Sequence, residues 1–261
     1  VERTSLAEAE VEYQEKTSPT IWVKFPVLRD DGLDTRLAAS RAAAKVEGAH
    51  FDELCSREFY GEFDGACVVI WTSTPWTIPG NRAISFSETI EYGLYEVSAI
   101  ESDLQFEPWA KAGDMLIVAD KLAADVFKAA KIAEAQRIMS VDPTGLVCAH
   151  PFRGQGYDFD VPLLAGDHVT DDAGTGFVHT APGHGADDFV IWTKHFGQEG
   201  IPFTVDEEGR FTKEAPGFEG LEILQLDGKN IGKDGPANKA VMDALIEAGA
   251  LLARGQLKHS Y

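Results

Sequence analysis

Three hydroxyl side chains, those of Thr72, Ser73 and Thr74, stand together where an apolar run ends. The run, Ala66–Thr72 (ACVVIWT), is rich in β-branched residues and predicts a strand buried on both faces. Hydroxyls and backbone N–H groups fixed at the end of such a strand can stabilise an oxyanion or position a water molecule. The structural alternative is a turn in which the same hydroxyls satisfy nearby backbone groups. Taken alone, the segment favours the turn.

Two prolines follow the hydroxyls, in the sequence Pro75-Trp76-Thr77-Ile78-Pro79. A proline lacks a backbone N–H group, and Pro75 disfavours a helical conformation for Thr74. The segment is therefore predicted to be rigid and extended, not helical.

A second segment, Gly174–Phe189 (GTGFVHTAPGHGADDF), combines glycines with histidines and two adjacent carboxylates. A short strand is predicted to end at His179, a Pro-Gly turn follows, and a helix begins near Asp187. Carboxylates in a first helical turn are favoured by the helix dipole, so Asp187 and Asp188 could simply cap the helix. In the functional interpretation, one aspartate caps the helix and the other projects towards a cationic group of a ligand.

Two other kinds of chemistry fit the spacing less well. A metal site made by His179, His184 and Asp187 lacks the one-turn ligand spacing of H-E-x-x-H. Ser73 acting as a nucleophile with His179 and Asp188 lacks a G-x-S-x-G elbow. We therefore expect no metal and no covalent intermediate.

Short strands must position both segments. Besides Ala66–Thr72, alternating or apolar runs predict strands at Thr20–Pro26, Ala83–Phe86, Tyr92–Val97, Met115–Val118 and Gly176–His179. Many short strands at this spacing indicate a closed barrel or a sandwich. The predicted fold class is α+β, with a barrel-like, mostly antiparallel β-sheet core and peripheral helices.

Apolar residues at helical spacing predict three helices around this core. The first has Asp120 as its N-cap and carries Leu122, Val126, Ala129 and Ala133; the second carries Phe189, Trp192 and Phe196 and ends at Gly197; the third has Pro236 in its first turn and carries Val241, Leu245, Ala248 and Leu252. An alanine-rich stretch within residues 30–60 is predicted to be a surface insertion.

The composition is that of a folded protein without membrane spans. The 261 residues are 44% hydrophobic, and no apolar run approaches the roughly 20 residues that cross a bilayer. The three cysteines, Cys55, Cys67 and Cys148, are far apart and form no C-x-x-C pair, which favours a reducing cytoplasm. The formal net charge of −20 argues against tight binding of nucleic acid by this chain alone.

Together, the two chemical segments resemble the editing domain of isoleucyl-tRNA synthetase, which is similar to those of the valyl and leucyl enzymes. Residues 71–83 match the pattern W-T-T-T-P-W-T-x-P-x-N-R-A, and residues 174–188 match G-T-G-x-V-H-T-A-P-G-H-G-x-D-D. Residues 17–25 and 258–261 resemble the points where that domain joins the rest of the synthetase. The resemblance implies that residues 1–261 are a single editing domain from a larger synthetase.

The resemblance also implies a reaction, the hydrolysis of valine mischarged on isoleucine tRNA, valyl-tRNA(Ile), by a positioned water in a pocket that excludes isoleucine. Asp188 would bind the α-ammonium group of the substrate, and Thr72, Ser73 and Thr74 would hold the terminal ribose, the carbonyl and the water.

Further positions carry expected roles in substrate binding. Trp76 would help to wall the side-chain pocket, His179 would border it and help to exclude isoleucine, and Asn81 would support the threonine-rich peptide. No cofactor is implied for this domain. ATP and its metal belong to the synthetic domain, whose HIGH-like and KMSKS-like motifs do not occur here, so no adenylation activity is expected.

The implied partners are the aminoacylated 3′ CCA end of tRNA(Ile), its valine moiety and the rest of the synthetase, with no membrane. The rest of the synthetase would hold the tRNA body, which relieves the charge problem. Arg82, Lys194 and Lys213 are candidate local contacts with the RNA.

One departure leaves alternatives open, because Ser73 stands where the family has its middle threonine. A catalytically weak module that binds the CCA end and the aminoacyl group is one alternative. A metal-dependent hydrolase that uses His179, His184 and Asp187 is the other.

Overall fold

A computed structural model describes residues 15–30, 63, 65–226 and 232–260 of the chain. The predicted insertion at residues 30–60 lies, apart from Asp30, outside the described residues, as does Cys55. The described strands are β1 (Glu15–Asp30), β2 (Ala66–Thr72), β3 (Ala83–Phe86), β4 (Tyr92–Ile100), β5 (Met115–Ala119), β6 (Ile132–Val141), β7 (Leu146–Ala149), β8 (Asp160–Ala165), β9 (Val178–Thr180) and β10 (Leu251–Ser260).

The described strands form one 10-stranded sheet in the order β10-β1-β7-β8-β3-β9-β2-β5-β4-β6. An additional pairing of β1 with β2 closes β1, β7, β8, β3, β9 and β2 into a barrel. The pairs β2–β5, β2–β9 and β3–β8 are parallel, and the other described pairs are antiparallel. The predicted fold class, a barrel-like and mostly antiparallel core, is confirmed.

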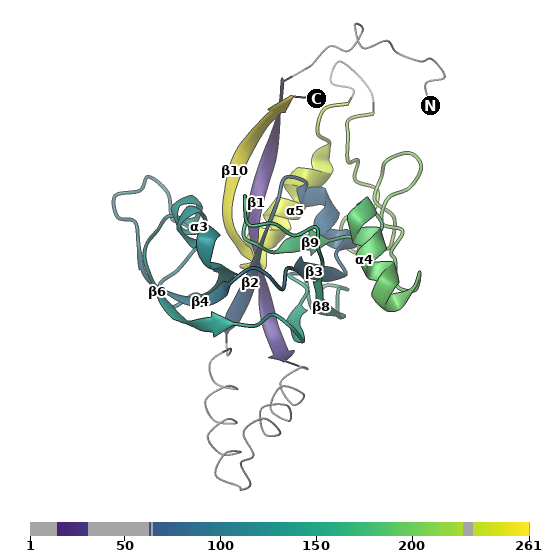
Figure 1. Ribbon diagram of the computed structural model, residues 1–261. Helices are drawn as coiled ribbons and strands as arrows, with labels where there is room; N and C mark the ends of the chain where they lie inside the picture. The colour runs from purple at the N-terminus through teal and green to yellow at the C-terminus, as the bar shows by residue number, and fades with distance from the viewer. Residues whose placement is uncertain (1–14, 31–62, 64, 227–231, 261) are drawn as a thin grey trace, which may run out of the picture.

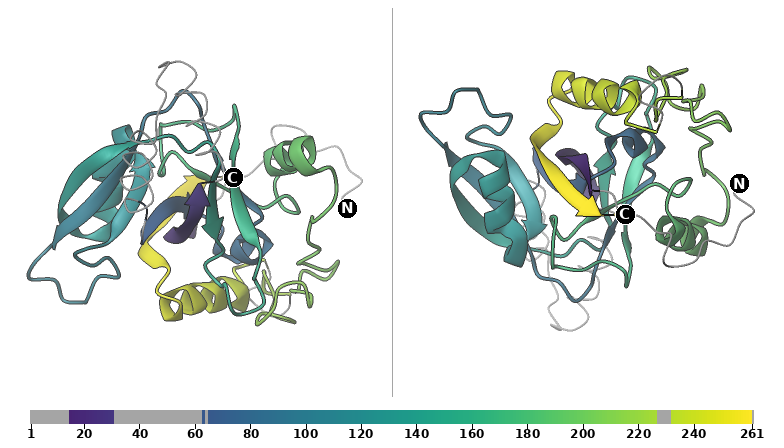
Figure 2. Two further views of the ribbon diagram at one scale, coloured as in Figure 1. Left: turned by 90° about the horizontal axis from the view of Figure 1, so that it is seen from below. Right: turned by 90° about the horizontal axis from the view of Figure 1, so that it is seen from above.

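Helices cover the barrel from different sides. They are α3 (Ala123–Ala130), α4 (Ala186–Phe196), α5 (Pro236–Glu247) and the short 3₁₀ helices η2 (Pro75–Gly80) and η3 (Asp120–Leu122). Figures 1 and 2 show α3, β4 and β6 on one side of the barrel and α4 on the opposite side. Among the described residues, no helix is long and apolar enough to cross a membrane.

The apolar residues of the barrel strands fill its interior. Fully buried side chains include those of Ile21, Phe25, Ile70, Ile84 and Leu94. Val68 and Ile70 face this main core, whereas Val69 packs into a second cluster beneath α3, so β2 is covered on both faces as predicted.

The first strand is longer than predicted, because it continues through Pro26 to Asp30. Up to Pro26 it pairs with β2, and from Val27 onward it pairs with β7. The proline therefore stands where the strand changes partners, a position at which a missing N–H group interrupts neither ladder.

Two of the predicted helices also end earlier than expected. Lys131 adopts a left-handed conformation (φ 62°) and ends α3, so Ala133 lies in β6. Ala248 is the C-cap of α5, and Leu252 lies in β10. The prediction for α4 is confirmed, including its end at Gly197.

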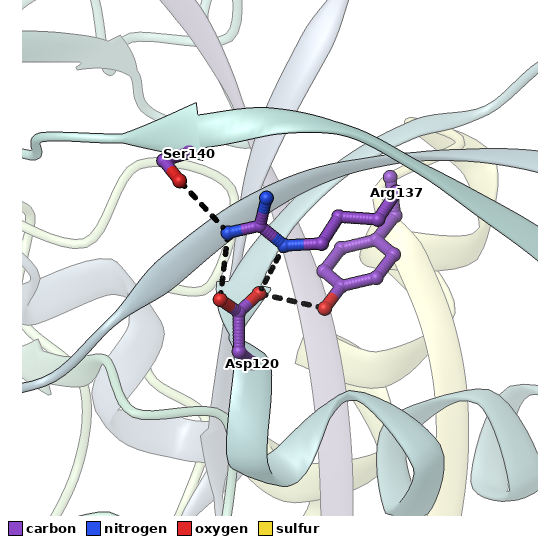
Figure 3. A network of polar contacts seen from close by, with 4 residues as sticks. Asp120, Arg137 and Ser140 are labelled. Carbon is purple, nitrogen blue, oxygen red and sulfur yellow. Dashed lines mark hydrogen bonds and ion pairs between the residues drawn. The ribbon is translucent and has the colours of Figure 1, made fainter.

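Asp120 does not cap a helix as predicted but joins three strands. Its carboxylate accepts hydrogen bonds from Arg137 Nε (2.9 Å), Arg137 Nη2 (2.7 Å) and the Tyr95 hydroxyl (2.7 Å). Arg137 Nη2 also donates to Ser140 Oγ at 3.0 Å (Figure 3). Gly93 makes room for this cluster, since a Cβ atom there would overlap the carboxylate. The network thus ties the end of β5 to β4 and β6.

We expect Asp120→Asn to destabilise the protein in a pH-dependent way. The hydrogen bonds from Arg137 and then Tyr95 lower the pKa of Asp120, so its stabilising effect is full above the unfolded pKa of about 3.9 and is lost as the pH falls through the lower folded value. Water screens this partly exposed cluster, so urea unfolding at pH 7 should show a loss of about 1 kcal/mol or less. The difference from the parent protein should shrink in acid.

Asp171→Asn is the matched control, since Asp171 pairs with the more exposed Lys121. Its effect on unfolding should be smaller than that of Asp120→Asn. Equal losses for the two variants at every pH would contradict a special role for the Asp120 cluster.

Candidate functional site

The hydroxyl-rich segment leads from β2 directly into a helix. The prediction of an extended segment was wrong, because Pro75–Gly80 forms the 3₁₀ helix η2. Pro75 occupies its first position, where an N–H group has no partner within the helix in any case. Thr74 itself remains non-helical (φ −131°, ψ 70°), as the residue before a proline is expected to be.

The hydroxyls of this segment divide into engaged and free groups. Thr72 Oγ1 accepts the N–H of Thr74 at 3.1 Å, which is the local turn contact that the structural alternative predicted. The hydroxyls of Ser73 and Thr74 make no hydrogen bond to any residue that the structure describes, and both side chains are half-buried. They are therefore available to a ligand.

His179 is held by hydrogen bonds on both ring nitrogens. Thr77 Oγ1 lies 3.0 Å from Nε2, and the Asn81 side-chain amide donates to Nδ1 at 2.8 Å. Because the Thr77 hydroxyl donates to Thr74 O at 2.8 Å, it accepts from an N–H group at Nε2 of His179. Burial lowers the pKa of His179 to about 3, and nearby His184 acts in the same direction. The ring is neutral and fixed.

Asn81 connects η2 with the strands that follow it. Its amide nitrogen also donates to Ala83 O at 2.8 Å, and its side chain is fully buried. Thr77, which the sequence did not single out as a site residue, completes this connection through His179.

Trp76 projects from the same helix towards another histidine. Its backbone N–H donates to Asn238 Oδ1 at 3.0 Å, and its ring packs edge-on against His184 with centroids 5.0 Å apart. His184 in turn bonds to Thr204 Oγ1 at 2.7 Å.

Asp188 is anchored on the backbone just before α4. The N-cap of α4 is Gly185, which has no side chain to cap it, and Asp188 Oδ2 accepts the N–H of Ala181 at 2.9 Å. Burial raises the pKa of Asp188, while the Ala181 bond and His168 oppose that shift. Asp187 remains exposed, so the two aspartates have different environments.

One cavity collects part of the predicted site. Its volume is about 260 Å³, and its lining residues are Trp71, Thr72, Ser73, His168, Thr170, Ala173, Gly174, Gly176, Phe177, Val178 and His179. Thr72, Ser73 and His179 are thus brought together, whereas Thr74, Trp76, Asn81 and Asp188 are not among the lining residues. His168 is an addition that the sequence did not signal.

Two further cavities lie elsewhere on the described surface. The first, of about 320 Å³, shares His168 with the cavity above and is also lined by Ser87, Asp187 and Lys194. The second, of about 480 Å³, lies between α3 and β10 and is lined by none of the predicted site residues. Its larger volume therefore does not make it the better candidate.

Two other predictions fare differently in the structure. Arg82 is engaged within the fold, because its guanidinium lies 4.3 Å from the Phe159 ring centroid and donates to Asn81 O at 2.6 Å. Burial lowers its pKa to about 10, so Arg82 is not a free cation for RNA. No group of three or more His, Cys, Asp or Glu side chains within the described ranges could hold a metal ion.

We expect the imidazole of His179 to stay neutral through the physiological range. Its pKa of about 3 predicts no titration of its NMR resonances between pH 8 and 5, with the proton on Nε2 throughout. His150, stacked on Tyr157 with 4.6 Å between centroids, has a pKa lowered to about 3 by burial and should behave alike.

Protein stability should follow from the same two groups. In the unfolded chain both histidines take up protons near pH 6.5, so the free energy of unfolding should fall as the pH drops from about 6.5 towards 3. Urea unfolding across this range measures it, and the urea-unfolded chain supplies the reference titration. A His179 resonance that titrates near pH 6.5 in the folded protein would overturn the assignment.

Comparison with known proteins gives relatives over the full length of the chain. It is 54% identical over 263 residues to an isoleucine–tRNA ligase of Caulobacter vibrioides and 49% identical over 273 residues to one of Bradyrhizobium diazoefficiens. Both alignments cover 100% of this chain and 24% of the relative, so the chain spans about a quarter of the length of these proteins. No protein-family model matches the chain.

A solved structure shares the fold at low sequence identity. The editing domain of the cytosolic leucyl-tRNA synthetase of P. falciparum superposes with a TM-score of 0.50 and 8% identity. The superposition covers 90% of this chain and 99% of that domain. At this identity the likeness concerns the fold alone.

Proposed function

Because this chain belongs to the isoleucine–tRNA ligase family, as the homologue of about 24% of such an enzyme, we propose that it is an editing domain that hydrolyses valyl-tRNA(Ile). The observation that carries the proposal is the cavity that gathers Thr72, Ser73 and the neutral His179. The free hydroxyl of Ser73 and the backbone of the turn before η2 offer donors to an ester and its attacking water.

The charge arrangement suits an aminoacyl ester. Asp188 supplies a carboxylate for the α-ammonium group, and its backbone anchor at Ala181 fixes the direction from which that group is held. His179 adds no positive charge that would repel the ammonium, because burial keeps the ring neutral. Its rigid ring instead limits the space for the amino-acid side chain, which is how isoleucine would be excluded.

Selectivity between valine and isoleucine explains the need for such a site. One methylene group in an apolar pocket discriminates only about 10- to 200-fold, and the isoleucine–valine pair is the usual example. A second site that accepts only the smaller side chain multiplies this ratio. The partners in this proposal are the CCA end of tRNA(Ile), its valine moiety and the rest of the synthetase, which holds the tRNA body despite the formal charge of −20 on this chain.

We expect Asp188→Ala, introduced into the full-length protein, to slow deacylation of valyl-tRNA(Ile) by about 10- to 100-fold, the value of a hydrogen bond to a charged group. Release of labelled valine from the mischarged tRNA measures this rate.

Asp187→Ala is the matched control, because Asp187 is the exposed neighbour of Asp188 on the same helix. It should leave the rate near that of the parent protein. Undiminished deacylation by Asp188→Ala would sink the proposal, and a loss confined to Asp187→Ala would favour the metal-dependent alternative instead.

The weak binding module is tested at Ser73. If the chain is already an active hydrolase, Ser73→Thr should change the deacylation rate by less than about fivefold, because one buried methyl group is worth only about 0.8 kcal/mol. A gain of about 100-fold or more would instead show that the parent serine has left the site with little activity. The binding of valyl-tRNA(Ile), measured in parallel, separates a change in rate from a change in affinity.

A further inference from the structure

His168 lies between two cavities and has no part in the mechanism described so far. Its half-buried side chain lines both the cavity with Ser73 and the neighbouring cavity with Asp187. Its Nε2 atom is buried and has no hydrogen-bond partner among the residues that the structure describes. Buried polar atoms in native proteins are rarely left without a partner, so this one calls for an explanation.

The backbone beneath the ring fixes its position. A Cβ atom at Gly166 would come within 2.8 Å of His168 Cε1 and 2.9 Å of Nδ1. The imidazole therefore lies directly on the backbone just after β8, at a distance that only a glycine permits. This close packing holds the ring at the boundary between the two cavities.

The ring is also electrostatically coupled to the carboxylate of Asp188. A charge on His168 would lower the pKa of Asp188, against the effect of burial. One carboxylate oxygen of Asp188 is taken by the N–H of Ala181, which leaves the other oxygen for a ligand. His168 and Asp188 thus lie near each other with one acceptor each still unused.

We propose that His168 and Asp188 bind the α-ammonium group of the substrate together. An ammonium group has three N–H donors, and one carboxylate oxygen satisfies only one of them well. The lone pair of a neutral imidazole at Nε2 is a second acceptor, which a rotation of the ring turns towards the cavity. His179 cannot serve in this way, since both of its ring nitrogens are already hydrogen-bonded.

This inference rests on the proposed function and can fail separately from it. The test compares two esters of the same tRNA in the full-length protein: valyl-tRNA(Ile), and the analogue in which 2-hydroxyisovalerate replaces valine, so that a hydroxyl stands in place of the ammonium. His168→Ala should lower kcat/KM for the valyl ester by about 10-fold, the value of one hydrogen bond to a charged group. For the hydroxy ester it should change kcat/KM by less than about twofold.

Two more variants identify the nitrogen that acts. Glutamine places its amide near the position of Nε2 and asparagine near that of Nδ1, so His168→Gln should recover most of the loss on the valyl ester and His168→Asn should not. His195→Ala, at an exposed histidine of α4, is the control and should match the parent protein on both esters. Thermal unfolding of each variant shows that it is folded.

Each outcome decides the question. Equal losses on both esters would show that His168 only supports the structure, and no loss on either would show that it does not touch the substrate; both results overturn the inference and leave the proposed function standing. Failure of the parent protein to hydrolyse the valyl ester would overturn the proposed function, and the inference with it.

Discussion

The hydrogen bonds between Thr77, His179 and Asn81 are the constraint on which the site depends. They connect η2, which follows the hydroxyl-rich turn, to β9, which carries the second motif. Without them the two segments would share only short ladder contacts, such as Trp71 with Val178. Because the imidazole is buried and neutral, it serves as a rigid linker with one donor and one acceptor, a function that a charged ring would not fulfil.

Burial sets opposite protonation tendencies on the two sides of the cavity. It lowers the pKa of His179 and raises that of Asp188, since in each case the charged form is poorly solvated. The N–H of Ala181 counteracts burial at Asp188 and favours the carboxylate. The site therefore presents negative charge on one side and a neutral polar wall on the other, the complement of a cationic amino group on an uncharged ester.

The sequence predicted the barrel and the two motifs well, because both depend on local patterns. β2 and β3 have their predicted bounds, and α4 ends at the predicted glycine. β6 was missed because Ala133 continues the helical spacing of α3, and only the left-handed backbone at Lys131 breaks it. β8 was missed because it contains Pro162, and β7 because it is only Leu146–Ala149. His168 carries no local signal at all, since its place between two cavities comes from tertiary packing.

The antiparallel pair of β1 and β10 has a consequence for how the chain acquires its structure (Figure 1). Glu15 pairs with Ser260, so the first and last described strands lie side by side although almost the whole described chain separates them. Pairings this distant in sequence close the largest loops and form slowly. On the ribosome, β1 must wait for β10 to emerge, and until then its edge is open to strands of other chains. The protein is thus most exposed to aggregation while it is being synthesised.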